Sequence, residues 1–203
     1  MDTQDKILGS FFDEAVSHGA MVSFSPEEEA KLEPLIKLWD LKPGQRVLEP
    51  GCGSGRLTER LAQLVLPGGG VWGVDLSAEM IKVAKGRNLP SRVSFTVDTA
   101  SSLPHTDGFF DKVICFNAFP HFSDTQKTLK EFRRVLKPEG EFWIAHTQSR
   151  EELNDFHSQL SEVVAHHHLP ERKDLEMALQ KAGFKIALFG NGSRGYWVQA
   201  VLD

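Results

Sequence analysis

The chain has 203 residues, 40% of them hydrophobic, which is long enough for one domain around a single well-buried core. Its formal net charge of −5, with no run of like charges, argues against binding to nucleic acid or anionic membranes, so we expect a small-molecule partner. Two cysteines without CxxC spacing, and the absence of a signal peptide or long apolar stretch, lead us to expect a cytoplasmic protein without membrane insertion.

Residues 1–24 carry scattered aromatic side chains with no sustained helical or strand period, and we interpret them as an N-terminal lid segment. Phe11, Phe12 and Phe24 either cover a bound ligand from the N-terminal side or pack as core, and the sequence leaves both open. The first predicted helix starts after Ser25, where an N-cap is followed by proline and acidic residues, and it runs to about residue 40.

Strands and helices alternate through the middle of the chain. Short apolar runs bounded by turn residues predict strands, and amphipathic runs with capping residues predict helices. The predicted strands are residues 46–49, 71–75, 93–97, 111–116 and 141–145, and the predicted helices are residues 56–66, 77–86 and 125–136. This order requires parallel crossover connections and therefore predicts an α/β fold with a doubly wound, Rossmann-like sheet.

The C-terminal part of the chain has a different pattern. One helix is predicted by four apolar residues with helical spacing, Phe156, Leu160, Val163 and Val164. A second helix is predicted at residues 171–182, and strands at 185–189 and 196–202 flank the sequence GNGSRG, which is typical of a hairpin. We therefore expect a seven-stranded sheet, mostly parallel with an antiparallel last strand, in a single domain that spans residues 1–203.

The loop GCGSG at residues 51–55 places glycines at alternate positions directly after the first strand, where a doubly wound sheet binds its ligand. Its spacing differs from the GxGxxG of dinucleotide-binding proteins, and Glu49 is a poor neighbour for a diphosphate but a good one for a cation. Asp75 and Asp98 end the second and third strands, where carboxylates can accept hydrogen bonds from ribose hydroxyls and an exocyclic amine. The three acids predict a site for a positively charged adenosine compound without phosphates.

Five stretches of the chain resemble class I S-adenosylmethionine (SAM)-dependent methyltransferases, in particular the type 11 group that includes enzymes similar to those of ubiquinone and menaquinone biosynthesis. The stretches are VLEPGCGSGRLT (47–58), GVDLSAEMIKVAK (73–85), VDTASSLP (97–104), FDKVICFNAFPHF (110–122) and EFRRVLKPEGEFWIAH (131–146). The resemblance covers roughly residues 25–147. It implies SAM as the cofactor and S-adenosylhomocysteine (SAH) as its product.

The resemblance also implies roles for the residues of the glycine loop. Gly51, Gly53 and Gly55 would let the backbone approach the methionine part of the cofactor, with Glu49 beneath the loop. The glutamate stands where an aspartate is commoner in the family. Cys52 belongs to the loop as a small filler rather than a nucleophile, because no histidine is adjacent in sequence to activate it.

The resemblance also assigns cofactor-binding roles to residues at the ends of the second and third strands. By the resemblance, Asp75 would accept the ribose hydroxyls, Leu76 and Met80 would line the adenine, and Asp98 with the amide of Thr99 would bind the adenine edge. A different interpretation of Asp75 stays open, because an aspartate after a strand often serves only to cap the next helix.

The fourth strand is followed by Asn117, which the resemblance places beside the reacting sulfonium, and by His121 in the region that lines the acceptor pocket of such enzymes. His121 is either a general base that takes a proton from an acceptor hydroxyl or a residue of the pocket wall. Residues 117–120, Asn-Ala-Phe-Pro, lack the Asn-Pro-Pro-aromatic signature of amino-methylating DNA enzymes. This difference argues against a nucleic-acid substrate.

His166, His167 and His168 suggest a metal site, but consecutive side chains point in different directions and do not converge easily on one ion. We predict no metal site, and a solvated helix end is the simpler interpretation. One of the three can still reach the acceptor pocket, because residues 149–173 lie where this fold commonly builds its substrate cover.

We therefore predict a SAM-dependent methyltransferase that passes the sulfonium methyl group, by in-line displacement, to an O, N, S or C atom of a small organic acceptor. A dry aromatic pocket of Phe116, Phe119 and Phe122 would disfavour the charged cofactor relative to its neutral product. Two alternatives stay open. One is a SAM-binding regulatory or scaffold protein without catalysis. The other is an NAD-linked oxidoreductase, although GxGxxG and a hydride-handling residue are not found.

Overall fold

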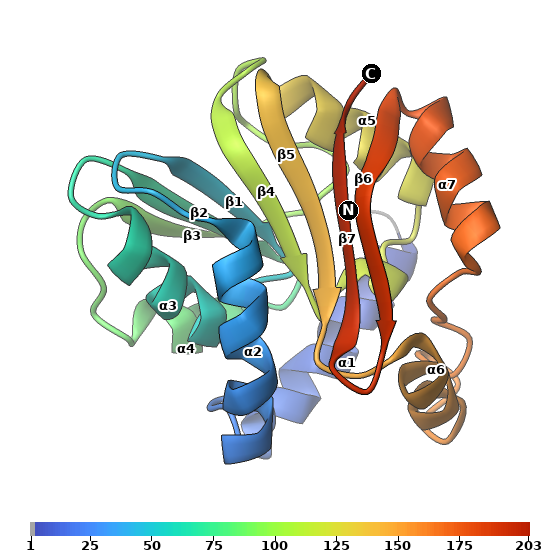
Figure 1. The fold of residues 1–203 in the computed structure, drawn as a ribbon. Helices are drawn as coiled ribbons and strands as arrows, with labels where there is room; N and C mark the ends of the chain where they lie inside the picture. The colour runs from blue at the N-terminus through green and yellow to red at the C-terminus, as the bar shows by residue number, and fades with distance from the viewer. Residues whose placement is uncertain (1–2) are drawn as a thin grey trace.

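The computed structural model describes residues 3–203 and contains one seven-stranded sheet (Figure 1). The strands are β1 (Arg46–Pro50), β2 (Gly70–Asp75), β3 (Val93–Val97), β4 (Phe110–Phe116), β5 (Leu136–His146), β6 (Phe184–Gly192) and β7 (Gly195–Leu202). The helices are α1 (Thr3–Ser17), α2 (Pro26–Trp39), α3 (Arg56–Val65), α4 (Ala78–Lys85), α5 (Thr125–Val135), α6 (Arg150–Ser158) and α7 (Arg172–Lys181), with a 3-10 turn η1 at Phe119–His121.

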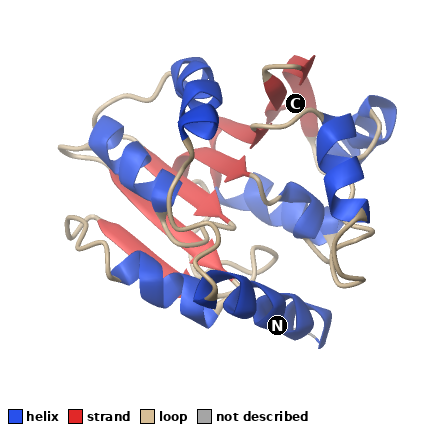
Figure 2. Cartoon of the chain, turned by 90° about the horizontal axis from the view of Figure 1, so that it is seen from below, coloured by secondary structure: helices blue, strands red, loops and turns tan. Residues whose placement is uncertain are grey.

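The strand order is β3-β2-β1-β4-β5-β7-β6, and β7 runs antiparallel to both of its neighbours. Five parallel strands with helices on both sides of the sheet form the rest of the fold (Figure 2). This arrangement confirms the predicted doubly wound sheet with an antiparallel last strand. Within residues 3–203, no helix is both long and apolar enough to cross a bilayer.

Alternating side chains along the strands build one apolar core on each face of the sheet. On β1, Val47 packs with α2 and α3, whereas its neighbour Leu48 packs with α5 and α7 on the other face. Large rings fill both layers, with Trp39 and Trp143 on the first and Phe142 on the second. Because helices cover both faces, the central strands are continuous apolar runs rather than alternating ones.

Residues 1–24, whose sequence has no sustained period, contain the helix α1, and residues 1 and 2 lie outside the described part of the chain. The buried positions of α1 are Asp5, Leu8, Gly9 and Val16, so a carboxylate and a glycine stand in what is normally an aliphatic stripe. A Cβ added to Gly9 would lie 3.1 Å from the carbonyl oxygen of Leu76, because α1 packs closely over the start of α4. Because an aspartate and a glycine interrupt the apolar stripe of α1, the helical period of its apolar residues cannot be recognised in the sequence.

The predicted helix through Phe156 and Val164 is shorter than expected. α6 ends at Ser158, and Phe156 and Leu160 are 49% and 38% exposed, whereas Val164 is buried. One continuous helix would have put these apolar residues on the same face. The chain instead turns after α6, which directs Val164 inward and leaves the other two in solvent.

The carboxyl ends of β1, β2, β3 and β4 meet at one edge of the sheet, where β1 pairs with β2 on one side and β4 on the other. α1 packs on α4 and lies below these strand ends in Figure 1. The chain reverses its winding direction between β1 and β4, which is the position where doubly wound sheets bind ligands.

Candidate functional site

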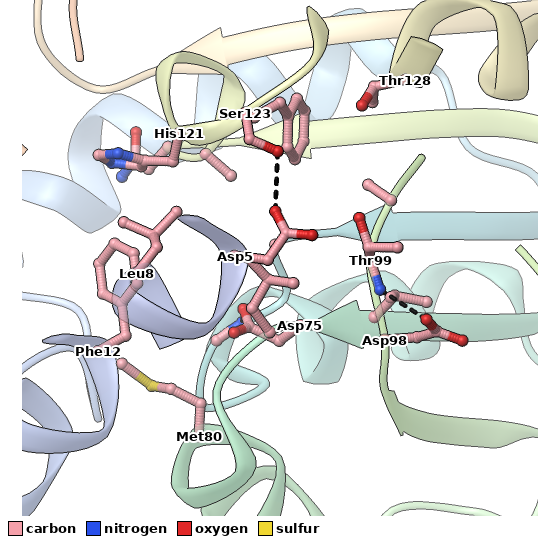
Figure 3. Close-up of a pocket in the computed structure, with 18 of the residues that line it drawn as sticks. Asp5, Leu8, Phe12, Asp75, Met80, Asp98, Thr99, His121, Ser123 and Thr128 are labelled. Carbon is pink, nitrogen blue, oxygen red and sulfur yellow. Dashed lines mark hydrogen bonds between the residues drawn. The ribbon is translucent and has the colours of Figure 1, made fainter. Parts of the chain in front are cut away.

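A cavity of about 710 Å³, including its open mouth, lies at this edge of the sheet (Figure 3). Its walls come from α1, from the loop after β1, from the ends of β2, β3 and β4, and from the start of α5. The site residues expected from the sequence that line it are Gly51, Gly53, Asp75, Leu76, Met80, Asp98, Thr99, Asn117 and His121. The fold thus brings together residues that four separate strand ends contribute.

The loop after β1 needs its first two glycines for different reasons. Gly51 has φ +71°, and an added Cβ would lie only 2.3 Å from the Cβ of Ala118, so the loop packs directly against the segment after β4. Gly53 has φ +51°, but its Cβ position has no heavy atom closer than 3.8 Å and faces the cavity. Gly51 therefore serves packing, whereas Gly53 leaves room beside the backbone for a ligand.

Three expected site residues, Glu49, Cys52 and Gly55, lie behind the cavity wall rather than on it. Glu49 is 2% exposed and accepts a hydrogen bond from the Thr58 hydroxyl, and burial raises its pKa to about 8. Burial also raises the pKa of the Cys52 thiol well above its ordinary value, so Cys52 is a packed thiol. Gly55 begins α3, where a Cβ would lie 3.0 Å from the Phe95 ring.

Asp75 ends β2 and ties the glycine loop to the start of α4. Its Oδ2 accepts a hydrogen bond from the amide of Gly53 at 2.8 Å, and its Oδ1 accepts one from the amide of Ser77 at 2.9 Å. The N-cap of α4 is Ser77, whose hydroxyl accepts from the amide of Met80, so capping is not the main role of Asp75. Burial raises the pKa of Asp75, and its carboxylate keeps further lone pairs on the cavity side.

Asp98 and Thr99 form the wall opposite His121 (Figure 3). The Asp98 amide donates to the carbonyl of Asp75 at 3.0 Å, which fixes the end of β3 against β2. Asp98 Oδ1 accepts from the amide of Thr99 at 2.8 Å. The Thr99 amide, which the resemblance assigns to the adenine edge, is therefore engaged by its own neighbour, and the half-buried carboxylate of Asp98 is the group that faces the cavity.

Asn117 has an uncommon backbone conformation, with φ +52° in a residue other than glycine. Its amide donates to the carbonyl of Ala145 at 2.9 Å, and its Oδ1 accepts from the amide of Thr147 at 3.4 Å. Contacts with β5 therefore hold this residue in place at the end of β4. Strained backbone of this kind is concentrated at functional sites, and Asn117 lines the cavity.

α1 supplies cavity residues that the sequence does not reveal, Asp5 and Leu8, together with Phe12 from the expected lid. The Ser123 hydroxyl donates to Asp5 Oδ1 at 2.8 Å, which joins α1 to the segment after β4 (Figure 3). The ring of Phe12 meets that of His121 edge to face, with centroids 5.3 Å apart. No motif pointed to Asp5, because its position depends on how α1 packs.

The expected aromatic pocket is only partly correct. Phe122 lines the cavity, but Phe116 and Phe119 are buried in the core. Phe116 ends β4 with its side chain on the α2 face of the sheet, where it contacts Phe24 and Trp39. The strand pleat, which alternates side chains between faces, places Phe116 away from the cavity. The ring that α1 adds to the cavity, Phe12, partly replaces it.

One of the three consecutive histidines reaches the cavity wall. His167 Nδ1 lies 2.9 Å from His121 Nδ1, whereas His166 and His168 are exposed. The ring of His157 lies 5.0 Å from that of His121, and His157 Nδ1 is hydrogen-bonded to the carbonyl of His167. Within residues 3–203, no group of three or more histidine, cysteine or acidic side chains has the arrangement of a metal site.

The charges that line the cavity are all acidic. Asp5, Asp75 and Asp98 are on its wall, and no lysine or arginine is among the lining residues in the described part of the chain. A site of this kind favours a cation over an anion.

Residues 41–188 match the family described as "Methyltransferase domain". The chain belongs to the class I SAM-dependent methyltransferases. This membership confirms the resemblance and makes SAM the cofactor of the family to which the chain belongs.

Two curated relatives illustrate the similarity. The chain is 32% identical to "Methyltransferase GfsG" of Streptomyces halstedii over 76% of this chain and 58% of the relative. It is 37% identical to "Demethylmenaquinone methyltransferase" of Lactobacillus johnsonii over 55% of this chain and 48% of the relative. The chain thus spans about half the length of the curated relatives it matches.

Among solved structures, the chain is similar to phosphoethanolamine N-methyltransferase 2 of Haemonchus contortus in complex with phosphomonomethylethanolamine and SAH. The two are 28% identical with a TM-score of 0.62, over 77% of this chain and 37% of that chain. The neighbour therefore shares the fold and holds the cofactor product.

Proposed function

We propose that this chain binds SAM in the cavity and transfers its methyl group to a small organic acceptor without a negative charge. The observation that carries the proposal is the set of acids at the ends of β2 and β3, on a cavity whose lining has no basic side chain in the described part of the chain. Such a wall suits SAM, in which the sulfonium and ammonium groups outweigh the one carboxylate, and it disfavours an acceptor that carries a phosphate or a carboxylate.

In this proposal the cofactor would lie against the wall formed by the ends of β1, β2 and β3. The methionine part would lie along Gly51 and Gly53, where the second glycine leaves open space. The ribose hydroxyls would donate to Asp75, and the adenine amine to Asp98. The other lining residues of this half are Leu76, Met80, Thr99, Ala100 and Asn117.

The acceptor would lie on the opposite side, against α1 and the segment after β4. Leu8, Phe12 and Phe122 form an apolar surface there, and Ser123 and His121 add polar groups. In-line displacement breaks the bond between the methyl carbon and sulfur as the acceptor atom bonds to that carbon, and sulfur keeps the electron pair. Positioning of the two reactants supplies much of the rate.

We propose His121 as the general base for an acceptor that loses a proton. Burial, together with His157, His167 and His146, holds its pKa well below the ordinary value, so the ring is neutral at physiological pH and has a lone pair to offer.

Thermal unfolding in the presence of SAH, with NAD in parallel, tests the cofactor. At about a hundredfold excess over its dissociation constant, SAH should stabilise the protein by roughly 2.7 kcal/mol, or about 5 to 10 °C for a chain of this size. A shift with SAH alone supports the proposal and justifies a screen of uncharged and cationic acceptors. A shift with NAD alone would favour the oxidoreductase class instead.

Turnover separates catalysis from binding. A SAM-binding regulatory protein would show the SAH shift but no transfer of labelled methyl from SAM to any member of a broad acceptor panel. Transfer to one acceptor class, abolished by competing SAH, establishes the enzyme.

A further inference from the structure

His121, which lines the cavity, pairs with a second histidine from a distant part of the chain. His121 lies in η1 directly after β4, and His167 lies in the segment between α6 and α7. The two Nδ1 atoms are 2.9 Å apart, which is hydrogen-bond distance. In such a contact one ring carries the Nδ1 proton and the other must have a bare Nδ1, so each ring determines the tautomer of the other.

The segment that carries His167 is held in place independently of this contact. His157 Nδ1 is hydrogen-bonded to the carbonyl of His167, and the Asn154 side chain bonds both the amide and the carbonyl of Leu169. Val164 and Leu169, on either side of the histidines, are 1% exposed. The position of the His167 ring is therefore set by contacts on both sides of it.

The two rings differ in their surroundings. The pKa of His121 is lowered by burial and by the imidazoles of His157, His167 and His146. Its other ring neighbour, Phe12, carries no charge. His167 is partly exposed and has its neighbours His166 and His168 in solvent. If His167 carries its proton on Nε2, water can hydrate that N–H group. If His121 carried its proton on Nε2, the nitrogen that is available to a ligand in the cavity could no longer accept a proton.

We propose that His167 is a positioning residue for the transfer reaction: its bare Nδ1 accepts the Nδ1 proton of His121, so that Nε2 of His121 presents its lone pair to the methyl acceptor. This inference rests on the proposed methyl transfer with His121 as base. As the acceptor atom bonds to the methyl carbon, the bond between the acceptor atom and its hydrogen breaks. The electron pair of that bond stays on the acceptor atom, and the proton passes to His121 Nε2. The resulting imidazolium keeps its Nδ1–H donated to His167.

The inference is tested by measuring which ring nitrogen of His121 carries the proton, and this measurement needs no methyl acceptor. The protein, labelled with ¹⁵N-histidine and saturated with SAH, is studied by NMR of the ring nitrogens at neutral pH. Signals are assigned with His121→Asn and His167→Asn. We expect Nδ1 of His121 to be protonated and Nε2 bare, with the reverse arrangement in His167. A His121 ring protonated on Nε2 would overturn the inference.

Two variants distinguish positioning from mere packing. His167→Leu removes the acceptor, and His121 should then populate both tautomers. His167→Asp supplies a charged acceptor, which should keep the Nδ1 proton on His121 and raise its pKa by roughly 1 to 3 units. His166→Leu is the matched control on the same segment and should leave the His121 signals unchanged. Identical His121 tautomers in His167→Leu and wild type would reject the positioning role.

SAH binding, measured by calorimetry on the same samples, separates this inference from the proposed function. Failure of the wild type to bind SAH would overturn the proposed function, whatever the tautomer. Normal SAH binding with an Nε2-protonated His121 would overturn only the role of His167. If His167→Leu does not fold, the wild-type tautomer still decides the question.

Discussion

Asp75 and Asp98 accept hydrogen bonds from backbone amides, so the fold itself orients their carboxylates. Asp75 binds the amides of Gly53 and Ser77, and its removal would loosen both the glycine loop and α4. Asp98 holds only the adjacent Thr99 amide. Asp98 is therefore the better residue for separating ligand binding from folding.

We expect Asp98→Ala to lower the affinity for SAH by roughly 10- to 100-fold, because a hydrogen bond to a charged group contributes about 1.5 to 3 kcal/mol. The free energy of unfolding should change by about 1 kcal/mol or less, since the lost contact is local. Calorimetric titration and urea unfolding measure the two effects. Asp174→Ala, an exposed acid on α7, is the matched control. Unchanged SAH affinity would remove Asp98 from the adenosine site.

Glu49 makes the stability of the protein depend on pH. Its pKa in the folded chain is about 8, against an ordinary value of 4.5, because it is buried. The folded chain thus keeps a proton that the unfolded chain loses, and this stabilisation is fully present below about pH 4 and lost as the pH rises through 8. Between these limits the free energy of unfolding should fall by about 1.4 kcal/mol per pH unit from this group.

Glu49→Gln tests this linkage, since glutamine is neutral at every pH. Urea unfolding from pH 5 to pH 9 should show the variant gaining stability relative to wild type as the pH rises. Its affinity for cationic SAM should also fall, because the variant can no longer develop a negative charge beneath the loop. Parallel stability curves for the two proteins would show that Glu49 ionises at its ordinary pH.

Side-chain hydrogen bonds at both ends attach α1 to the rest of the fold. Asp13 Oδ1 accepts from the Ser77 hydroxyl at 2.5 Å and from the amide of Glu79 at 3.0 Å, which attaches α1 to the start of α4. At its other end, Asp5 accepts from Ser123. α1 therefore joins the two sides of the cavity.

We expect Asp13→Ala to weaken the attachment of α1 at a cost of about 1 kcal/mol, because two hydrogen bonds at a helix N-terminus are lost. Hydrogen exchange of the α1 amides should accelerate, and SAH should dissociate faster. Glu14→Ala, an exposed neighbour on the same helix, controls for helix propensity. Unchanged exchange in α1 would show that its other contacts suffice to hold it.

The elements could be predicted where local pattern and tertiary packing agree. The run from β1 to β5 combines apolar strands, capping residues and turn glycines, and each points to the same fold. α1 could not be predicted because its packing face contains Asp5 and Gly9 in place of aliphatic residues. Asp5 is there because it accepts a hydrogen bond from Ser123, and Gly9 because the backbone of Leu76 lies close to it. The sequence indicated that one of the three consecutive histidines could reach the acceptor pocket, but the pairing of His121 with His167 depends on tertiary packing and could not be predicted.

At the scale of the whole molecule, the net charge of −5 and the acidic cavity act together on a charged ligand. SAM carries one net positive charge, whereas SAH carries none. We expect the association rate of SAM to fall with added salt, and that of SAH to change little, because screening weakens long-range attraction only for the charged ligand. Stopped-flow binding at low and high salt measures both. Equal salt dependence would show that the acids do not steer the cofactor.

The two halves of the cavity come from different parts of the chain. The glycine loop and the acids lie between β1 and β3, whereas the opposite wall is built by α1, η1 and the residues from η1 to the start of α5. The segment that carries His167 lies behind this wall, in contact with His121. The hydrogen bonds that orient Asp75 and Asp98 come from backbone amides of the first group itself. Under the proposed function, evolution, or a designer who exchanges the segments of the second group for those of a relative, can change the methyl acceptor while the cofactor site stays the same.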